Sequence, residues 1–209
     1  MLAPSFIVLS LVVAAILAVT SRNRWVVLGI LAWLVLTGIL AARGSLRDFS
    51  SLPPAAPVLF YAGFIMTMWV ALSKASASWL LLPLPFFVGF QSFRILVELC
   101  IHEAVTEDIA PPQMTWSGLN FDIVSGVTAL LLAPFAGRVP RGVLLAWNIL
   151  GLCLLVWVVS VATLSFPTRF QMLTPANSWV ADFPYVWLPT VHVCAALLMH
   201  VILFRRLRR

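Results

Sequence analysis

Four polar side chains interrupt one long apolar stretch of this 209-residue chain. Gln91, Arg94, Glu98 and His102 occur in the sequence FQSFRILVELCIHEAVTED, among mostly apolar neighbours. An amide, a guanidinium, a carboxylate and an imidazole are groups that bind ions, carry protons or hold a polar ligand. In an apolar surrounding they are costly to bury, and for that reason they indicate a functional site.

The spacing of these four residues predicts that they share one face of a helix. At 100° per residue they fall within an arc of about 80°, and they extend about 16 Å along the axis. We call this face the polar seam, with Gln91 at its deep end and His102 at its outer end. Arg94 and Glu98 are four residues apart, which predicts an ion pair between them. Two interpretations remain open: a buried pair that fixes helix packing, or a path for protons, ions or a substrate.

Further polar residues in apolar runs could meet the polar seam. Asn120 and Asp122 stand at the start of a later run, where an acidic residue is favoured by the helix dipole and where capping alone is the alternative. His192 and His200 are eight residues apart and thus about 80° apart around a helix, which places them poorly for one shared metal ion. His200 should lie deeper, with another partner. The residues expected to converge in the outer half are Arg94, Glu98, Asp122 and His192.

The composition places these residues in a membrane protein. Apolar residues make up 62% of the chain and charged residues only 10%, whereas soluble domains average about 25% charged residues. A spanning helix needs about 20 mostly apolar residues, and seven runs qualify. We therefore predict an all-α polytopic membrane helical bundle, as a single transmembrane domain over residues 1–209. The predicted spans are residues 4–20, 25–42, 57–73, 79–102, 120–137, 142–163 and 186–204.

Two local features refine this reading. Pro83 and Pro85 should break or kink the fourth span near its start, so that its regular part begins near Phe86. Asn148 lies inside the sixth span, and a buried asparagine there should form a hydrogen bond across helices.

The basic residues predict the orientation of the bundle, because cytoplasmic loops are enriched in Lys and Arg. Nine of them fall on one side and three on the other, which predicts an outside N-terminus and a cytoplasmic C-terminus. The long loops 103–119 and 164–185 then lie outside. Their aromatic residues either anchor the bundle at the interface or belong to a lid over it. The nine are Arg22, Arg24, Lys74, Arg138, Arg141, Arg205, Arg206, Arg208 and Arg209, and the three are Arg43, Arg47 and Arg169. The aromatic residues are Trp116, Trp179, Tyr185 and Trp187.

Several classes of protein are excluded. The net charge of +6 arises from cations in short gaps rather than from a basic stripe, so nucleic acid is not an expected partner. The expected partners are the lipid bilayer and a small-molecule or ion substrate. Lys74, the sole lysine, lies in a predicted loop, which excludes a retinal Schiff base within the bundle. Nucleotide-binding loops and the hydrolase motifs GxSxG and HExxH are absent. No cofactor is predicted.

Three functional classes remain. The polar seam favours translocation of a small solute, a proton or an ion through a pocket open to the outside. The alternative is a membrane-embedded enzyme, in which the histidines with Glu98 and Asp122 bind a metal, or His102 and His192 clamp a haem. A structural or assembly subunit of a larger membrane complex is the third class.

A set of short motifs resembles those of a family of uncharacterised bacterial integral membrane proteins. The motifs are FRILVE, MTWSGLNFDI, WNILGL, SFPTRFQ and FPYVWLP, followed by His200, and they extend from about residue 88 to the C-terminus. The resemblance implies a bacterial inner membrane location and carries no known activity. Its pattern includes Arg94, Glu98, Asn120, Asp122 and His200, and it does not clearly include His102 or His192.

Overall fold

A computed structural model describes residues 2–208, and within them it contains helices and no strands. Six helical units are long and apolar enough to cross a membrane, and a seventh is shorter. All seven fall on the predicted runs. The six long units are α1 (Leu2–Ser21), α2 (Arg24–Ala42), α3 (Ala55–Leu72), α4 with α5 (Leu84–Phe90 and Phe93–Thr106), α7 (Arg141–Leu164), and a π-helical turn (Leu188–Val193) followed by α8 (Cys194–Leu207). The shorter unit is α6 (Ile123–Leu132) with a 3-10 turn (Ala133–Phe135).

The helix boundaries follow from local sequence. The Asn23 side chain accepts a hydrogen bond from the Trp25 backbone N–H at 3.0 Å and so caps α2. Gly44 follows α2 with φ +71°, a conformation that glycine adopts without strain. A proline precedes three helices and fixes the backbone where each begins. These prolines are Pro54 before α3, Pro83 before α4 and Pro140 before α7.

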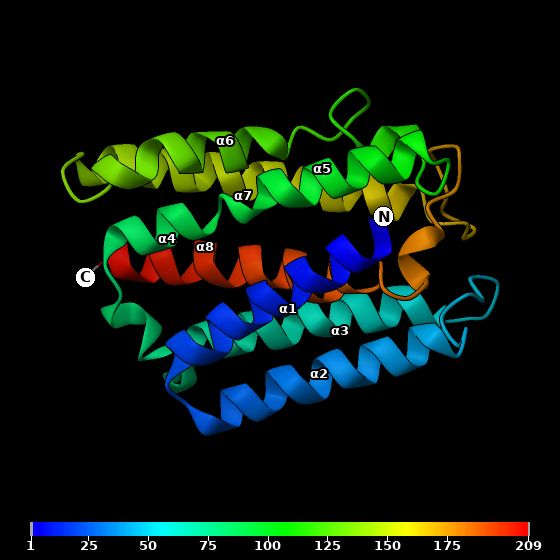
Figure 1. Ribbon diagram of the computed structural model, residues 1–209, viewed down its shortest axis with the longest axis horizontal. Coiled ribbons are helices and arrows are strands. Elements are labelled where there is room, and N and C mark those ends of the chain that lie inside the picture. Colours follow the sequence, from blue (N-terminus) through cyan, green and yellow to red (C-terminus); the bar gives the residue numbers. More distant parts are fainter. Residues whose placement is uncertain (1, 209) are drawn as a thin grey trace.

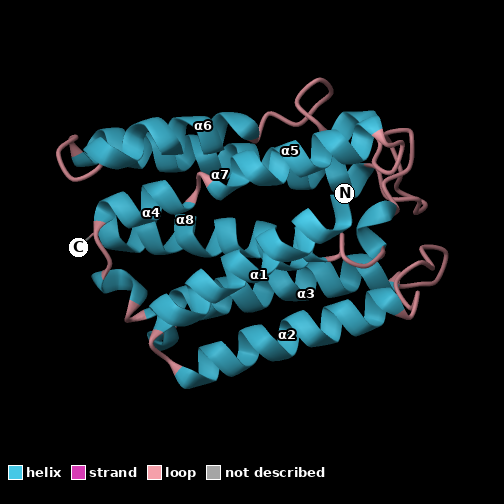
Figure 2. Cartoon of the chain, viewed as in Figure 1, coloured by secondary structure: helices cyan, strands magenta, loops and turns pink. Residues whose placement is uncertain are grey.

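The helices run roughly antiparallel, so that the connections gather at two ends (Figure 1, Figure 2). The N-terminus and the connections 43–54, 107–122 and 165–187 lie at one end, which we call the N-terminal end. The C-terminus and the connections 22–23, 73–83 and 136–140 lie at the other, the C-terminal end. The α8 helix is central: it packs against α3, α7, α4 and α1. This unit is also the most buried of the six long ones.

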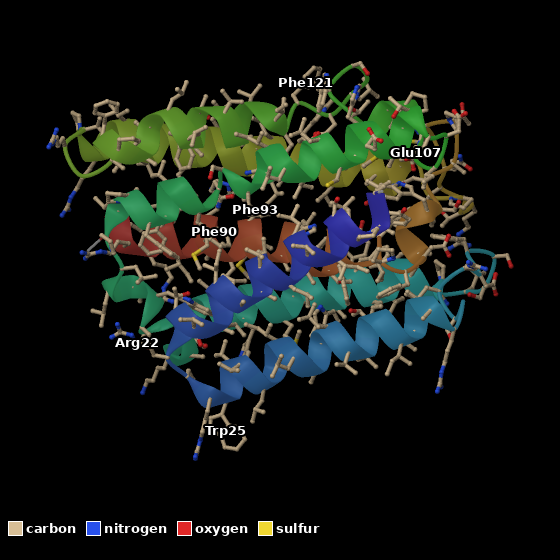
Figure 3. All side chains as sticks on the ribbon, in the orientation of Figure 1. Arg22, Trp25, Phe90, Phe93, Glu107 and Phe121 are labelled. Atoms are coloured by element: carbon tan, nitrogen blue, oxygen red, sulfur yellow. The ribbon has the colours of Figure 1, made fainter. Side chains whose placement is uncertain are left out.

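Charge divides sharply between the two ends, as Arg22 and Glu107 illustrate in Figure 3. Among residues 2–208, the C-terminal end carries cations and no carboxylate, whereas carboxylates outnumber cations at the N-terminal end. The cations at the C-terminal end are Arg22, Arg24, Lys74, Arg138, Arg141, Arg205, Arg206 and Arg208; Arg209 lies outside the described residues. The N-terminal end carries Arg43, Arg47, Arg169, Asp48, Glu103, Glu107, Asp108 and Asp182.

The fourth predicted span is two helices rather than one. The regular structure begins at Leu84, two residues before the expected start, with Pro85 in the first turn. The chain then breaks at Gln91 and Ser92, where the backbone N–H of Gln91 donates to Val88 and that of Ser92 to Gly89. The rings of Phe90 and Phe93 pack across this break with centroids 5.2 Å apart (Figure 3). Gln91 therefore does not share a continuous helix with the rest of the polar seam, which corrects the angular prediction for that residue.

The fifth predicted span, 120–137, is shorter than expected. The helical part covers Ile123–Phe135, which at ~1.5 Å per residue is about 20 Å, against a hydrocarbon core of about 30 Å. The preceding segment, residues 107–122, is irregular and leads from α5 to α6. Asp122 contacts Arg94, and Arg94 lies about 18 Å from the C-terminal end of α5. We call residues 107–122 the re-entrant segment, because it runs back alongside α5 before α6 begins (Figure 1).

Close packing makes this arrangement possible. A Cβ on Gly126 would lie 2.8 Å from Cγ1 of Ile95, so only glycine lets α6 approach α5 this closely. The buried Gln113 side chain of the re-entrant segment donates to Ser165 Oγ at 3.1 Å and to the Pro175 carbonyl at 2.6 Å. The two long connections at the N-terminal end are thereby joined.

The aromatic residues of these connections are only partly an interfacial belt. Trp179 and Trp187 are buried, and the indole N–H of Trp187 donates to the Leu34 carbonyl at 3.2 Å. Both rings pack inside the protein, so they are not lipid-facing anchors. Among the described residues, large exposed apolar side chains such as Trp25 instead cover the helical faces (Figure 3).

Candidate functional site

Arg94 is the centre of the polar interior. Its Nε donates to Asp122 Oδ2 at 2.6 Å and its Nη2 donates to Asp122 Oδ1, which makes a two-point ion pair. The prediction that Arg94 pairs with Glu98 is therefore wrong. The side of a guanidinium presents two parallel N–H groups that match one carboxylate, and Asp122 on the neighbouring element meets that geometry. Among residues 2–208 the other ion pair is the exposed Arg47–Asp182.

Asp122 is an ion-pair partner rather than a helix cap. It stands at the N-cap position of α6, yet its carboxylate forms no capping hydrogen bond. The Asn120 side-chain oxygen accepts from the Asp122 backbone N–H at 2.9 Å and stabilises this turn. The re-entrant segment thus presents the Asp122 carboxylate to Arg94.

His200 and Asn148 extend the ion pair into a chain. Nη1 of Arg94 lies 3.0 Å from His200 Nε2, and His200 Nδ1 lies 2.8 Å from Asn148 Oδ1. Because arginine only donates, Nε2 accepts, and Nδ1 carries the hydrogen that Asn148 accepts. Asn148 Nδ2 donates in turn to the His200 carbonyl at 3.1 Å, the interhelical bond expected of it. His200, expected to have another partner, therefore meets Arg94.

Gly151 provides the room for this imidazole. A Cβ at that position would lie 2.7 Å from Cε1 of His200, so any other residue would force the ring to shift. We call Asp122, Arg94, His200 and Asn148 the saturated chain, because each of these side chains has a hydrogen-bond partner from another helix or segment.

Glu98 lies one turn from Arg94 on α5 in a different environment. It is 1% exposed, and Asn120 Nδ2 donates to its two oxygens at 2.8 and 3.0 Å. Among the described residues no Lys, Arg or His nitrogen lies within 4.0 Å of this carboxylate. A buried carboxylate with a neutral amide as its partner retains unused acceptor capacity.

His192 also has an unused acceptor. Its Nε2 lies 3.2 Å from Ser10 Oγ, and Ser10 Oγ donates its own hydrogen to the Phe6 carbonyl at 2.8 Å. Nε2 is therefore the donor in the contact with Ser10, and Nδ1 of the neutral ring is an acceptor. This Nδ1 is buried and without a partner. Ser10 was not predicted as a partner of His192, because it is a single hydroxyl in an otherwise apolar run.

A cavity of about 70 Å³ brings these groups together. About 10–15 Å³ of such space suffices for one water molecule, so this cavity has room for several small polar atoms. Glu98 and His192 line it, and we call these two residues the open wall. The saturated chain contributes Arg94 and Asp122, and Asn120 lies beside them. Met114, Asn177 and Val180 from the long connections also line the cavity, as the lid alternative predicts.

Two residues of the polar seam lie away from this cavity. His102 is half-buried and stacks on Trp116, with ring centroids 4.3 Å apart and 20° between the planes, while its Nδ1 lies 3.3 Å from Thr115 Oγ1. Gln91 is buried at the helix break, where its Nε2 donates to the Ala196 carbonyl at 3.1 Å. Only Arg94 and Glu98 of the polar seam line the cavity.

The histidines have separate partners rather than a common one. His102 contacts Trp116, His192 contacts Ser10, and His200 contacts the saturated chain. Within residues 2–208, no three His, Cys, Asp or Glu side chains gather closely enough to hold a metal ion. The enzyme alternative therefore gains no support from a metal-binding arrangement.

The helices and the cavity define a class: a multi-pass membrane-type helical bundle with an interior cavity that a few polar side chains line. Comparison with family models, with curated proteins and with solved structures finds no match for this chain. Its function must therefore be argued from the cavity.

Proposed function

We propose that this protein translocates protons, or a small ion or solute, across a membrane, and that Glu98 is the group that takes up the proton or cation. One observation carries the proposal: Glu98 is a buried carboxylate at a cavity, with no cationic partner within 4.0 Å among the described residues. The charges of Arg94 and Asp122 balance each other. A proton or a bound cation is therefore needed to balance Glu98, and intramembrane carboxylates of this kind serve as proton and ion carriers.

The saturated chain has a different role in this proposal. Arginine stays protonated in proteins, so Arg94 cannot pass a proton to His200. The chain anchors α5 to α6, α7 and α8, while Glu98 exchanges its proton or cation with the cavity. The break at Gln91 and Ser92, just below Arg94, is a point where α4 and α5 can move against each other, because short 3-10 stretches within helices act as hinges.

We further propose that the N-terminal end faces the outside and that the C-terminal end is cytoplasmic, in a bacterial inner membrane. The division of charge between the ends supports the orientation, and the resemblance to uncharacterised bacterial membrane proteins supports the location. A Glu107→Cys variant, with Cys153 changed to Ser, tests the orientation. A membrane-impermeant maleimide added to intact cells should label it; labelling only after the cells are opened would contradict the orientation.

Proton flux tests the function directly. Purified protein in liposomes with a pH-sensitive dye inside should move protons when a membrane potential is applied, and Glu98→Gln should reduce the rate at least tenfold. Glu103→Gln is the matched control, because Glu103 is an exposed carboxylate on the same helix. It should leave the rate unchanged.

The flux of added small cations should be measured in the same liposomes. A wild-type flux equal to that of empty liposomes for protons and for these cations would overturn the translocation proposal. Full flux in Glu98→Gln would show that another group carries the proton or cation.

A further inference from the structure

Between α3 and α7 the cavity borders a surface groove, and we call this boundary the entrance. Tyr61 and Phe64 of α3, and Val159 and Thr163 of α7, line the cavity. The same four residues line a groove of about 420 Å³ on the surface of the bundle. Tyr61 is 42% exposed. The cavity thus adjoins an outward-facing groove as well as the loops at the N-terminal end.

One hydrogen bond spans this entrance. Tyr61 Oη lies 2.8 Å from Thr163 Oγ1, and Thr163 Oγ1 donates to the Val159 carbonyl at 2.8 Å. The hydrogen of Thr163 is thus already used, so Tyr61 is the donor in the contact between α3 and α7. Both helices pack against α8, which runs between them (Figure 1). Loss of this single bond would let the side chains at the entrance part.

The groove is apolar beyond the entrance. Its other residues include Leu152, Val156 and Leu197, and the hydroxyl of Ser160 is occupied by the Val156 carbonyl at 2.8 Å. A groove of this kind fits an aliphatic chain, which exchanges apolar lipid contacts for apolar side-chain contacts when it moves there from a bilayer.

The open wall indicates which polar head group a bound molecule with an aliphatic tail should carry. Glu98 and the unpartnered Nδ1 of His192 both accept hydrogen bonds, and both lack a cation. The cation of the cavity, Arg94, already donates to Asp122 and His200, and the Asp122 carboxylate balances its charge. The cavity therefore suits a positively charged head with several N–H donors and disfavours an anionic one.

We propose that the cavity binds lipophilic amines, molecules with an ammonium head and an aliphatic tail, and that they enter from the bilayer between α3 and α7. The ammonium head contacts Glu98 and His192, and the tail lies in the groove. This inference rests on the proposed role of Glu98 as the group that accepts a cation, and it names the substrate class of that same site.

Equilibrium binding of radiolabelled dodecylamine to the full-length protein in nanodiscs tests the proposal, with empty nanodiscs as background. Binding should saturate at one molecule per protein. Glu98→Gln should weaken it at least tenfold, and so should Val159→Trp, which fills the groove. The matched controls are Glu103→Gln and Leu131→Trp, a lipid-facing position on α6, and both should bind normally.

Two competitors separate the head from the tail. Methylamine has the head without the tail, and dodecyl phosphate has the tail with an anionic head. Neither should displace dodecylamine at equal concentration. Displacement by methylamine would contradict binding of the tail in the groove. Displacement by dodecyl phosphate would contradict the preference for a positively charged head. Binding that Glu98→Gln leaves unchanged would overturn the proposal.

The entrance has its own test, which does not depend on Val159→Trp folding. Tyr61→Phe removes only the hydroxyl that joins α3 to α7 and leaves Glu98 in place. Dodecylamine should therefore associate several-fold faster with this variant than with the wild-type protein. An unchanged association rate would contradict this entrance.

The binding and flux results also separate the two proposals. Proton flux without amine binding would leave translocation standing and refute the amine inference. Amine binding without any flux would leave the site standing and refute translocation.

Discussion

Arg94 and Glu98 are one turn apart on α5 and almost equally buried, 2% and 1% exposed, yet they belong to opposite kinds of polar environment. Arg94 is bound on two sides, by Asp122 and by His200. Glu98 accepts hydrogen bonds from the neutral side-chain amide of Asn120 and faces a cavity. The difference shows that burial of a charge alone does not identify a functional residue. What distinguishes the two is whether the surrounding protein already satisfies the charge.

The largest effect should come from breaking the saturated chain at its ion pair. Asp122→Asn leaves Arg94 charged and buried without its counter-charge, and removal of one partner of a buried pair costs about 3–5 kcal/mol. Unfolding in a denaturing detergent measures this loss of stability. The matched control is Asp182→Asn, which breaks the exposed pair with Arg47 and should cost about 0–1 kcal/mol. Equal losses in the two variants would refute the comparison.

A smaller effect is expected where packing rather than charge supports the saturated chain. Gly151→Ala places a methyl group against the His200 ring, and overpacking of this kind costs about 1–3 kcal/mol. Gly29→Ala on α2 meets no atom within 4 Å and should be neutral or slightly stabilising. The same unfolding assay compares them. A neutral Gly151→Ala would mean that the imidazole has room to shift.

Asn148, the last residue of the saturated chain, should contribute less to the free energy of unfolding than Asp122 or Gly151. Asn148→Ala removes the acceptor of the His200 Nδ1–H, and interhelical hydrogen bonds in membrane proteins contribute about 0.6 kcal/mol on average and up to about 1.7 kcal/mol. We expect a loss in that range in the unfolding assay. A double variant with Asp122→Asn should show coupling between the two sites, since both act through Arg94 and His200. Strict additivity would argue against one continuous chain.

The smallest loss of stability should come from the open wall. Glu98→Gln keeps an acceptor for Asn120 and removes a buried charge that no cation balances, so it should not lower the stability. The same variant should show the largest loss of flux. A destabilisation like that of Asp122→Asn would place Glu98 in the structural network and would remove the basis for its proposed role.

Much of the fold was accessible from the sequence. Long apolar runs separated by charged or proline-containing gaps predicted all seven helical units, because burial in a membrane demands continuous apolar length. The shortened α6 was not accessible, since the re-entrant segment depends on the approach of Gly126 to Ile95. The break at Gln91 was likewise hidden, because no proline or glycine stands at that position.

The polar residues of the interior were accessible as a set, whereas their pairing was not. The four-residue spacing of Arg94 and Glu98 predicted a local pair, but Asp122, 28 residues away, offers a two-point contact that Glu98 does not provide. The separation of His192 from His200 followed from their spacing. Ser10 and Tyr61 gave no signal, since a single hydroxyl in an apolar run has no pattern of its own.

The order of the chain gives the Arg94–Asp122 pair a consequence for synthesis. Asp122 follows Arg94 by 28 residues and His200 follows it by 106. At about 5–20 residues per second, Asp122 leaves the peptidyl-transferase centre about 1 to 6 s after Arg94, and His200 about 5 to 20 s after it. Until then the cation of α5 lacks the partners that it contacts in the folded chain. The polar chain through Arg94 is therefore completed only once the final helix has been made.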